Sequence, residues 1–240
     1  MTSLDRVVVL VAGGAGAVGS GIVGALLDAG ATVAVPSRMA GRLDALRERV
    51  GGADRLLGVV GDVAGAEDAG RVRDEIVATV GPPTAVVAAV GGWSSGPKLA
   101  DIALDDWDAI LARNLRTHQV VASTYIPLLR GRPGASYLVI VGDTAWAPAA
   151  GAGPVSVTAA AELMAARVLG LEESEAGIQV TALVLGPVRI RDRPAGPQQS
   201  LTAHDVGKEV TRRVAAGLTR AGAGEAEVVG LPATRTGSAG

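Results

Sequence analysis

The chain has 240 residues, a formal net charge of -2, no cysteine and two histidines. This length fits one α/β domain. The lack of cysteine excludes disulfides and thiolate chemistry, and two histidines are too few for a His-rich metal site, so we predict no metal. Without a basic block, we expect neither nucleic acid nor a membrane surface as a partner. We find no signal-peptide pattern and no apolar run near the roughly 20 residues of a membrane helix, so a cytoplasmic location is expected.

A glycine-rich turn lies between an apolar run and a helix near the start of the chain. Residues 6–12 are mostly apolar and rich in valine, which predicts a strand buried on both faces. Residues 19–30 then carry helical periodicity. Gly14, Gly16 and Gly19 between them form the pattern G-x-G-x-x-G, which lets a pyrophosphate approach backbone N–H groups and a helix N-terminus. An ordinary glycine-rich turn is the alternative, but the strand–turn–helix context favours a dinucleotide-binding turn.

Strand and helix patterns alternate along the rest of the chain. Apolar runs predict strands at 31–35, 56–60, 84–90, 137–141, 178–185 and 227–231. Helices are predicted over 42–50, 71–80, 105–129, 155–170 and 202–218. Residues 186–199 form a polar, proline-rich flap, and residues 232–240 a flexible tail. The alternation predicts one doubly wound domain over residues 1–231, a Rossmann fold with about seven parallel strands and ligands at their carboxyl ends.

The order of these landmarks resembles the short-chain dehydrogenase/reductase family in its compact single-domain form. The glycine turn matches, as do the pair Asp62-Val63 after the third strand, Gly91 after the fourth, a helix with Asn114, and Gly186 after the sixth. The resemblance covers residues 6–231 and implies an oxidoreductase that binds a nicotinamide dinucleotide. The cofactor-binding positions that it implies are Gly13, Gly14, Gly16, Val18, Gly19, Arg38, Asp62, Val63, Gly91 and Gly186.

The end of the second strand indicates which dinucleotide is bound. An acid at this place would hold the 2′-hydroxyl of NAD. The chain instead has Pro36-Ser37-Arg38, and a guanidinium can form paired hydrogen bonds with a 2′-phosphate. We therefore expect NADP(H) rather than NAD(H), with a solvated surface arginine as the alternative.

The resemblance fails at the residues that perform the family's chemistry, a Ser, a Tyr and a Lys. The Ser position falls on Gly142 or Asp143, the Tyr position on Val155 and the Lys position on Ala159. The Thr expected after the sixth strand is Ile190. These losses lie at the nicotinamide and proton-transfer end, whereas the adenine end is kept. We therefore expect weak cofactor binding, through the adenine half only, and weak or absent carbonyl reduction.

Two polar residues are candidate catalytic residues. Asp143 follows the fifth strand and would act as an acid or base if an apolar pocket raised its pKa, or else would cap a turn. Asn114 either takes part in the chemistry or only shapes its helix. His118 lies one helical turn further on and is either a packing or interface residue or a helper of Asp143.

Three functions remain open from the sequence. The first is a short-chain reductase relative that binds NADP(H) and a small-molecule ligand, with weak redox chemistry. The second is a non-redox lyase, isomerase or cyclase that uses Asp143. The third is a non-catalytic binding or partner subunit. Small residues on the helix at 155–170, among them Ala159, Ala160, Ala161, Ala165 and Ala166, predict a homodimer or homotetramer.

Overall fold

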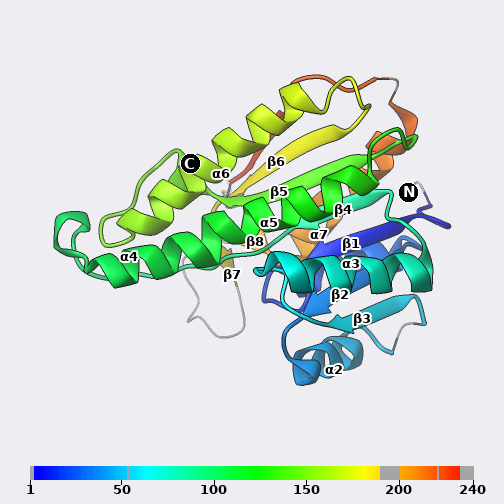
Figure 1. The fold of residues 1–240 in the computed structure, drawn as a ribbon, viewed down its shortest axis with the longest axis horizontal. Coiled ribbons are helices and arrows are strands. Elements are labelled where there is room, and N and C mark those ends of the chain that lie inside the picture. The colour runs from blue at the N-terminus through cyan, green and yellow to red at the C-terminus, as the bar shows by residue number, and fades with distance from the viewer. Residues whose placement is uncertain (1–2, 53, 190–200, 221, 233–240) are drawn as a thin grey trace, which may run out of the picture.

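A seven-stranded parallel sheet forms the centre of the computed structural model, which describes residues 3–52, 54–189, 201–220 and 222–232 (Figure 1). Its strand order is β3-β2-β1-β4-β5-β6-β9. The bounds are β1 Val8–Ala12, β2 Thr32–Ser37, β3 Leu56–Val60, β4 Ala85–Ala88, β5 Ser136–Gly142, β6 Gln179–Leu185 and β9 Glu227–Leu231. Because β1 pairs with β2 on one side and with β4 on the other, the winding reverses between β1 and β4. This confirms the predicted doubly wound, single-domain Rossmann fold.

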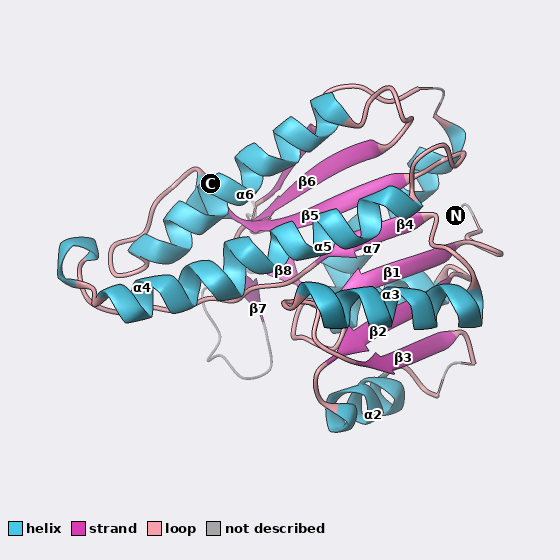
Figure 2. Ribbon diagram, viewed as in Figure 1, coloured by secondary structure: helices cyan, strands magenta, loops and turns pink. Residues whose placement is uncertain are grey.

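Helices cover both faces of the sheet (Figure 2). Their bounds are α1 Gly19–Asp28, α2 Ala40–Arg49, α3 Ala66–Val80, α4 Leu104–Leu111, α5 Thr117–Tyr125, α6 Gly153–Glu172 and α7 Ala203–Thr219. Along β1, Val9 and Val11 belong to the core under α1, α2 and α7, whereas Leu10 and Ala12 belong to the core under α3, α5 and α6. Successive side chains therefore enter opposite layers, which explains why the strand is apolar throughout.

Three local features differ from the sequence prediction. The helix expected over 105–129 is divided into α4, a π-helical turn at Ala112–Arg116 and α5, followed by a 3-10 turn at Ile126–Leu128. Helix α3 begins at Ala66, five residues before the predicted start at 71. A short parallel ladder joins β7 Val188–Arg189 to β8 Leu201–Thr202. Two-residue strands carry no periodicity, so sequence pattern alone does not reveal them.

Helix α6 corrects the expectation that no apolar segment has the length of a membrane helix. Its 20 residues are long and apolar enough to span a bilayer by length and composition alone. Half of that segment is buried inside the fold. The buried half includes Val155, Leu163 and Ala166, and α6 packs on β5 and β6. Burial of this kind is the pattern of a core helix.

Candidate functional site

The glycine turn after β1 is shaped largely by its own packing. Gly13 has a φ of +83°, and a Cβ atom there would lie 2.1 Å from the carbonyl oxygen of Ala89. A Cβ on Gly19 would lie 2.1 Å from the carbonyl oxygen of Gly13, and one on Gly14 would lie 2.9 Å from the side chain of Val35. The backbone therefore requires these three glycines whether or not a ligand is bound.

Gly16 differs from the other glycines of the turn. A Cβ there would approach only the carbonyl oxygen of Gly13, at 3.0 Å, and Gly16 lines both large cavities of the protein. Helix α1 begins just beyond it, with Val18 as its N-cap residue. The first N–H groups of a helix have no intrahelical partners and favour an anion. Of the glycines in the turn, Gly16 is therefore the one best explained by the need for a phosphate to approach the backbone closely.

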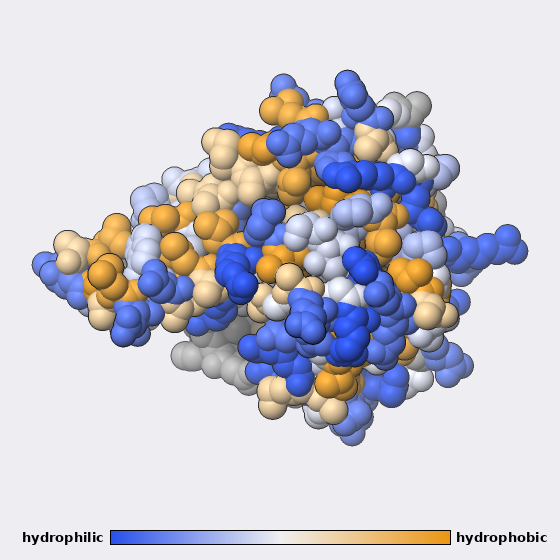
Figure 3. Space-filling view, viewed as in Figure 1, coloured by the Kyte–Doolittle hydropathy of each residue, from blue (hydrophilic) through white to orange (hydrophobic). Residues whose placement is uncertain are grey.

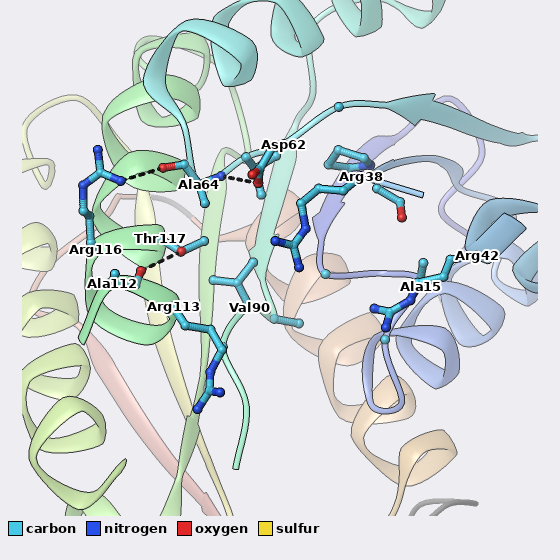
Figure 4. Close-up of a pocket in the computed structure, with 18 of the residues that line it drawn as sticks. Ala15, Arg38, Arg42, Asp62, Ala64, Val90, Ala112, Arg113, Arg116 and Thr117 are labelled. Carbon is cyan, nitrogen blue, oxygen red and sulfur yellow. Dashed lines mark hydrogen bonds between the residues drawn. The ribbon is translucent and has the colours of Figure 1, made fainter. Parts of the chain in front are cut away.

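The first cavity, which we call the arginine pocket, lies at the carboxyl ends of β1 to β4 and has a volume of about 590 Å³. Six of the predicted cofactor-binding positions line it, namely Gly13, Gly16, Arg38, Asp62, Val63 and Gly91. Figure 4 shows four arginine side chains around it, with Arg38 and Arg42 on one side and Arg113 and Arg116 on the other.

The four guanidinium groups differ in how they are engaged. Arg38 and Arg42 pair with no carboxylate in the described part of the chain. Arg116 donates to the carbonyl oxygen of Ala64 at 3.1 Å, and Arg113 donates to Asn114 Oδ1 at 3.2 Å (Figure 4 shows the first bond). Two cations are therefore free to meet an anion, and two are already oriented.

Asp62 has a local structural role as well as a place in the arginine pocket. Its Oδ1 accepts a hydrogen bond from the backbone N–H of Ala64 at 2.9 Å. Its own N–H donates to Asp68, and that bond, with a second from Arg71, lowers the pKa of Asp68. These bonds fix the turn after β3, so that Asp62 and Val63 face the pocket.

The second cavity, the apolar cleft, has a volume of about 640 Å³ and lies at the carboxyl ends of β4, β5 and β6. It shares Gly13, Gly16 and residues 89–91 with the arginine pocket, so the two cavities are neighbouring halves of one groove above β1 and β4. Its walls include Asn114, Asp143, Gly186, Val155 and Ala159. The remaining predicted positions, Gly14 aside, therefore also border this groove.

Asn114 lies in the π-helical turn with its side-chain amide fully engaged. Oδ1 accepts from the N–H of Gly92 and from Arg113, both at 3.2 Å. Nδ2 donates to the carbonyl oxygen of Gly92 and to Thr158 Oγ1, both at 3.3 Å. An amide has two donors and two acceptor positions, so none is left over. These contacts support the structural interpretation of Asn114, as the link between the end of β4 and α6.

Asp143 opens the 3-10 turn at Asp143–Ala145, directly after β5. Partial burial raises the pKa of its carboxyl, while the backbone N–H groups of Asp143 and Thr144 partly offset that rise. The side chain thus has both properties that the sequence left open, a local turn contact and a position in the cleft wall.

Val155 and Ala159, the positions of the family's Tyr and Lys, line the apolar cleft on α6. Both are buried. The hydroxyl of Thr158 between them donates to the carbonyl oxygen of Val155 at 3.0 Å and accepts from Asn114. Neither a phenol nor an ammonium group is therefore present at this part of the wall. Ile190 lies outside the described residues.

Sequence reasoning missed Glu162, a buried carboxyl that lines the apolar cleft. Its Oε2 lies 3.7 Å from Nε2 of His118, which is also buried. Burial raises the pKa of Glu162 to about 8 and lowers the pKa of His118 to about 4, although the Val90 backbone opposes the second shift. The signal was available, because Glu162 is an acid one helical turn after Thr158 and Ala159, on a helix face that is otherwise apolar.

Comparison with known proteins identifies the family. The model of the short chain dehydrogenase family matches residues 7–193. With the Rossmann fold and the glycine turn, this match shows that the chain belongs to the short-chain dehydrogenase/reductase family, an oxidoreductase family.

Several known proteins are similar to this chain. Bovine dehydrogenase/reductase SDR family member 4 is 28% identical over 187 residues, which are 78% of this chain and 67% of the bovine protein. A short-chain dehydrogenase/reductase from Serratia marcescens has a TM-score of 0.84 at 22% identity, over 96% of this chain and 98% of that one. The NADPH-bound short chain oxidoreductase of Pseudomonas aeruginosa PAO1, described as containing an atypical catalytic center, has a TM-score of 0.83 at 21% identity, over 99% and 100%. At these identities, the similarity of this chain to the two solved structures shows a common fold and nothing further.

Proposed function

We propose that this protein binds NADP(H) through the adenosine-phosphate half and catalyses ordinary carbonyl reduction weakly or not at all. The observation that carries the proposal is the contrast within the groove. Arg38 and Arg42 are available at one end, and Val155 and Ala159 replace the family's polar groups at the other. NADPH bound to the structurally similar oxidoreductase of P. aeruginosa supports the choice of dinucleotide.

The arginine pocket fits the phosphate-bearing half of the cofactor. The backbone at Gly16 and the first turn of α1 suit a pyrophosphate. Arg38 suits a 2′-phosphate, with Arg42 as a second cation nearby. Asp62 and Val63 border the place for the adenine that the family resemblance implies. Arg38 and Arg42 pair with no carboxylate in the described part of the chain, whereas the N–H of Gly16 already donates to the carbonyl oxygen of Gly13 at 2.9 Å. The two arginine charges are therefore the strongest support for this fit.

The apolar cleft does not fit the other half of the cofactor equally well. A bound nicotinamide dinucleotide supplies hydride chemistry to its family. In this chain the ribose hydroxyls would meet Ala159 in place of a Lys, and a substrate carbonyl would meet Val155 in place of a Tyr. Polar groups that lose water without gaining a partner cost affinity. The proton that a carbonyl needs has no phenol donor at the usual place.

The experiment that tests this function is NADPH consumption against a panel of ketones and aldehydes. We expect no turnover above background, while NADP⁺ binds and Arg38→Ala weakens that binding. Turnover at an ordinary enzymatic rate, about 1–10³ s⁻¹, with any carbonyl compound would contradict the proposal.

A second candidate function is non-redox proton transfer by Asp143. It is favoured by one observation, the raised pKa of a carboxyl in the cleft wall. Asp143→Asn should then abolish turnover of a lyase, isomerase or cyclase substrate while leaving NADP⁺ binding intact. A role as a non-catalytic partner subunit would instead show as a stable complex with a relative that has the Tyr and Lys.

We also propose that the protein self-associates through α6. The outward face of this helix exposes Val157, Met164, Val168 and Leu171, at the alternating spacing of a helix–helix seam. Figure 3 shows apolar surface over α6 and over the projecting end that carries α4. The small-residue face expected from sequence is partly wrong, because Ala159 and Ala166 are buried against the protein's own core.

Light scattering tests this assembly. We expect a dimer or tetramer at micromolar concentration, and Met164→Glu should shift it to monomers with an unchanged circular dichroism spectrum. A wild-type monomer would contradict the proposal.

A further inference from the structure

Glu162 stands between two cavities. On one side it lines the apolar cleft, together with Thr158 and Ala159. On the other side it lines a small cavity between α5 and α6, which His118 and Tyr137 also line. A carboxyl group in such a place has lost most of its water, since the residue is only 7% exposed. No hydrogen bond to its carboxyl is present among the described residues.

His118 is the polar group that backs this carboxyl. The residue is 6% exposed, and neither Nδ1 nor Nε2 makes a hydrogen bond of good geometry in the described part of the chain, although the Val90 backbone is near enough to oppose the fall in its pKa. The 3.7 Å between Nε2 and Glu162 Oε2 is too long for a hydrogen bond but short enough for strong electrostatic coupling. Unpaired buried nitrogens are costly, so their retention beside a carboxyl needs a reason.

At neutral pH, Glu162 and His118 share one titratable proton, which is on either the carboxyl or the imidazole. A neutral acid beside a neutral imidazole and a carboxylate beside an imidazolium contain the same number of protons, so either form has no net charge. The burial of both residues disfavours the ion pair and places the proton on Glu162 at neutral pH. The side of Glu162 that faces the cleft thus offers a neutral O–H donor.

We propose that Glu162, backed by His118, is the proton-donating group of the apolar cleft and receives the carbonyl or hydroxyl oxygen of a small, largely apolar ligand. The cleft walls support this ligand class, because Val18, Ile140 and Leu185 line the same cavity with apolar surface. If the proton is transferred, the O–H bond of Glu162 breaks, an O–H bond forms on the ligand, and the electron pair stays on the carboxylate. His118 acts as a positioning residue that stabilises this carboxylate.

The other titratable groups around the pair are few. His118 faces Glu162 from α5, Tyr137 lines the small cavity from β5, and Asp143 lines the cleft after β5. Burial raises the pKa of Tyr137 above its usual range, so this phenol stays neutral. No lysine or arginine lines either cavity among the described residues. Nothing cationic therefore holds Glu162 ionised, whereas the equally buried Glu173 is paired with Arg130 at 2.6 Å.

The test uses dicyclohexylcarbodiimide, an apolar reagent that adds to protonated carboxylic acids. The acid O–H breaks, its oxygen bonds to the central carbon of the reagent and the proton moves to nitrogen, so the mass rises by one whole reagent. We expect peptide mass spectrometry of the wild-type protein to find the adduct on Glu162 at pH 6.5. Labelling should fall about tenfold by pH 9, as expected for an acid whose pKa is about 8.

Glu173 is the matched control, and its pairing with Arg130 should leave it unlabelled at both pH values. An unlabelled Glu162 at pH 6.5, or labelling equal to that of Glu173, would overturn the proposal. Because the adduct is mapped on the wild-type chain, the result does not depend on whether Glu162→Gln folds.

Competition identifies the ligand chemistry. Cyclohexanone and cyclohexanol should slow the labelling of Glu162, whereas benzene, similar in size but without oxygen, should not. Equal protection by benzene, or none by either oxygen compound, would overturn the ligand class. His118→Leu should move the pH midpoint of labelling upward, because it replaces an imidazole, which favours the carboxylate electrostatically from 3.7 Å, by an apolar side chain. An unchanged midpoint would show that His118 has only a packing role.

Discussion

The two halves of the groove both lie at the carboxyl ends of the parallel strands, but one is lined by cationic side chains and the other is mostly apolar. The arginine pocket has four guanidinium groups and, in Asp62, one carboxylate tied into a turn. The apolar cleft has two carboxyls, Asp143 and Glu162, and no cation among its described lining residues. Both halves share the glycine turn.

This difference indicates that binding of a cofactor and chemistry on a substrate depend on different parts of the groove. The half proposed to bind phosphate depends on backbone geometry and on arginines, among them Arg38 after β2, whose backbone the fold positions. The half that would transfer a proton depends on particular side chains of α6. Val155, Ala159 and Glu162 line the cleft from α6, so their identities set its chemistry, although Ala159 also packs in the core beneath the helix.

The largest expected effect is on the turnover of carbonyl substrates. Loss of the general acid at the family's Tyr position, which is Val155 here, typically lowers a rate by about 10²–10⁴. Glu162 lies about two helical turns beyond that position and does not replace it. The Lys partner is lost in the same unit, so the two losses are not multiplied. NADPH oxidation followed by absorbance should therefore stay below about 1 s⁻¹ with simple ketones. An ordinary rate of carbonyl reduction would show that the apolar cleft retains the proton-transfer chemistry that we propose it has lost.

Removing Arg38 tests the first half directly. Arg38→Ala should lower NADP⁺ affinity by about 1.5–3 kcal/mol, the usual contribution of a hydrogen bond to a charged group, and should leave NAD⁺ affinity nearly unchanged. Arg116→Ala is the control, because this guanidinium already donates to the Ala64 carbonyl oxygen. If Arg38→Ala lowered the affinities for NADP⁺ and NAD⁺ equally, the proposal that Arg38 binds the 2′-phosphate would be contradicted.

The pH dependence of unfolding tests the second half. The folded pKa of Glu162, about 8, lies above its ordinary 4.5, so the folded state binds more protons and the free energy of unfolding falls as pH rises to 8. His118, whose pKa is lowered to about 4 from 6.5, has the opposite slope, mostly below pH 6.5 and with a small remainder just above it. Between pH 6.5 and 8 we therefore expect the free energy of urea unfolding to fall by about 1 kcal/mol.

Glu162→Gln should remove the fall in the free energy of unfolding between pH 6.5 and 8, because an amide does not titrate. Glu173→Gln should leave the slope unchanged, since Arg130 lowers the pKa of Glu173 and its titration lies at acid pH. A flat wild-type curve would mean that Glu162 is ionised in the folded protein.

Sequence reasoning reached the fold and the position of the groove because both depend on local patterns. The apolar strands and the glycine turn are features of neighbouring residues, and β3 and β9 were predicted with their observed bounds. The π-helical turn was not predictable in this way, because it is held by contacts of Asn114 with Gly92 and Thr158, which are distant in sequence.

The site was predictable where a family motif exists and not where the chain departs from it. Arg38 and Asp62 line the expected cavity. Arg113 and Glu162 were not expected there, because each reaches a cavity from a helix that sequence places only approximately. His118 was placed near Asn114 from sequence, but its titratable partner Glu162 is 44 residues away and appears only in three dimensions.

The central claim is that the adenosine-phosphate half of NADP⁺ supplies the affinity. Calorimetric titration of the wild-type protein with NADP⁺ and with 2′,5′-ADP tests it most directly. The account predicts dissociation constants within a few-fold of each other, both raised in Arg38→Ala. If NADP⁺ binds more than about tenfold tighter, a difference of about 1.4 kcal/mol, the nicotinamide half contributes its own binding energy and the claim is contradicted.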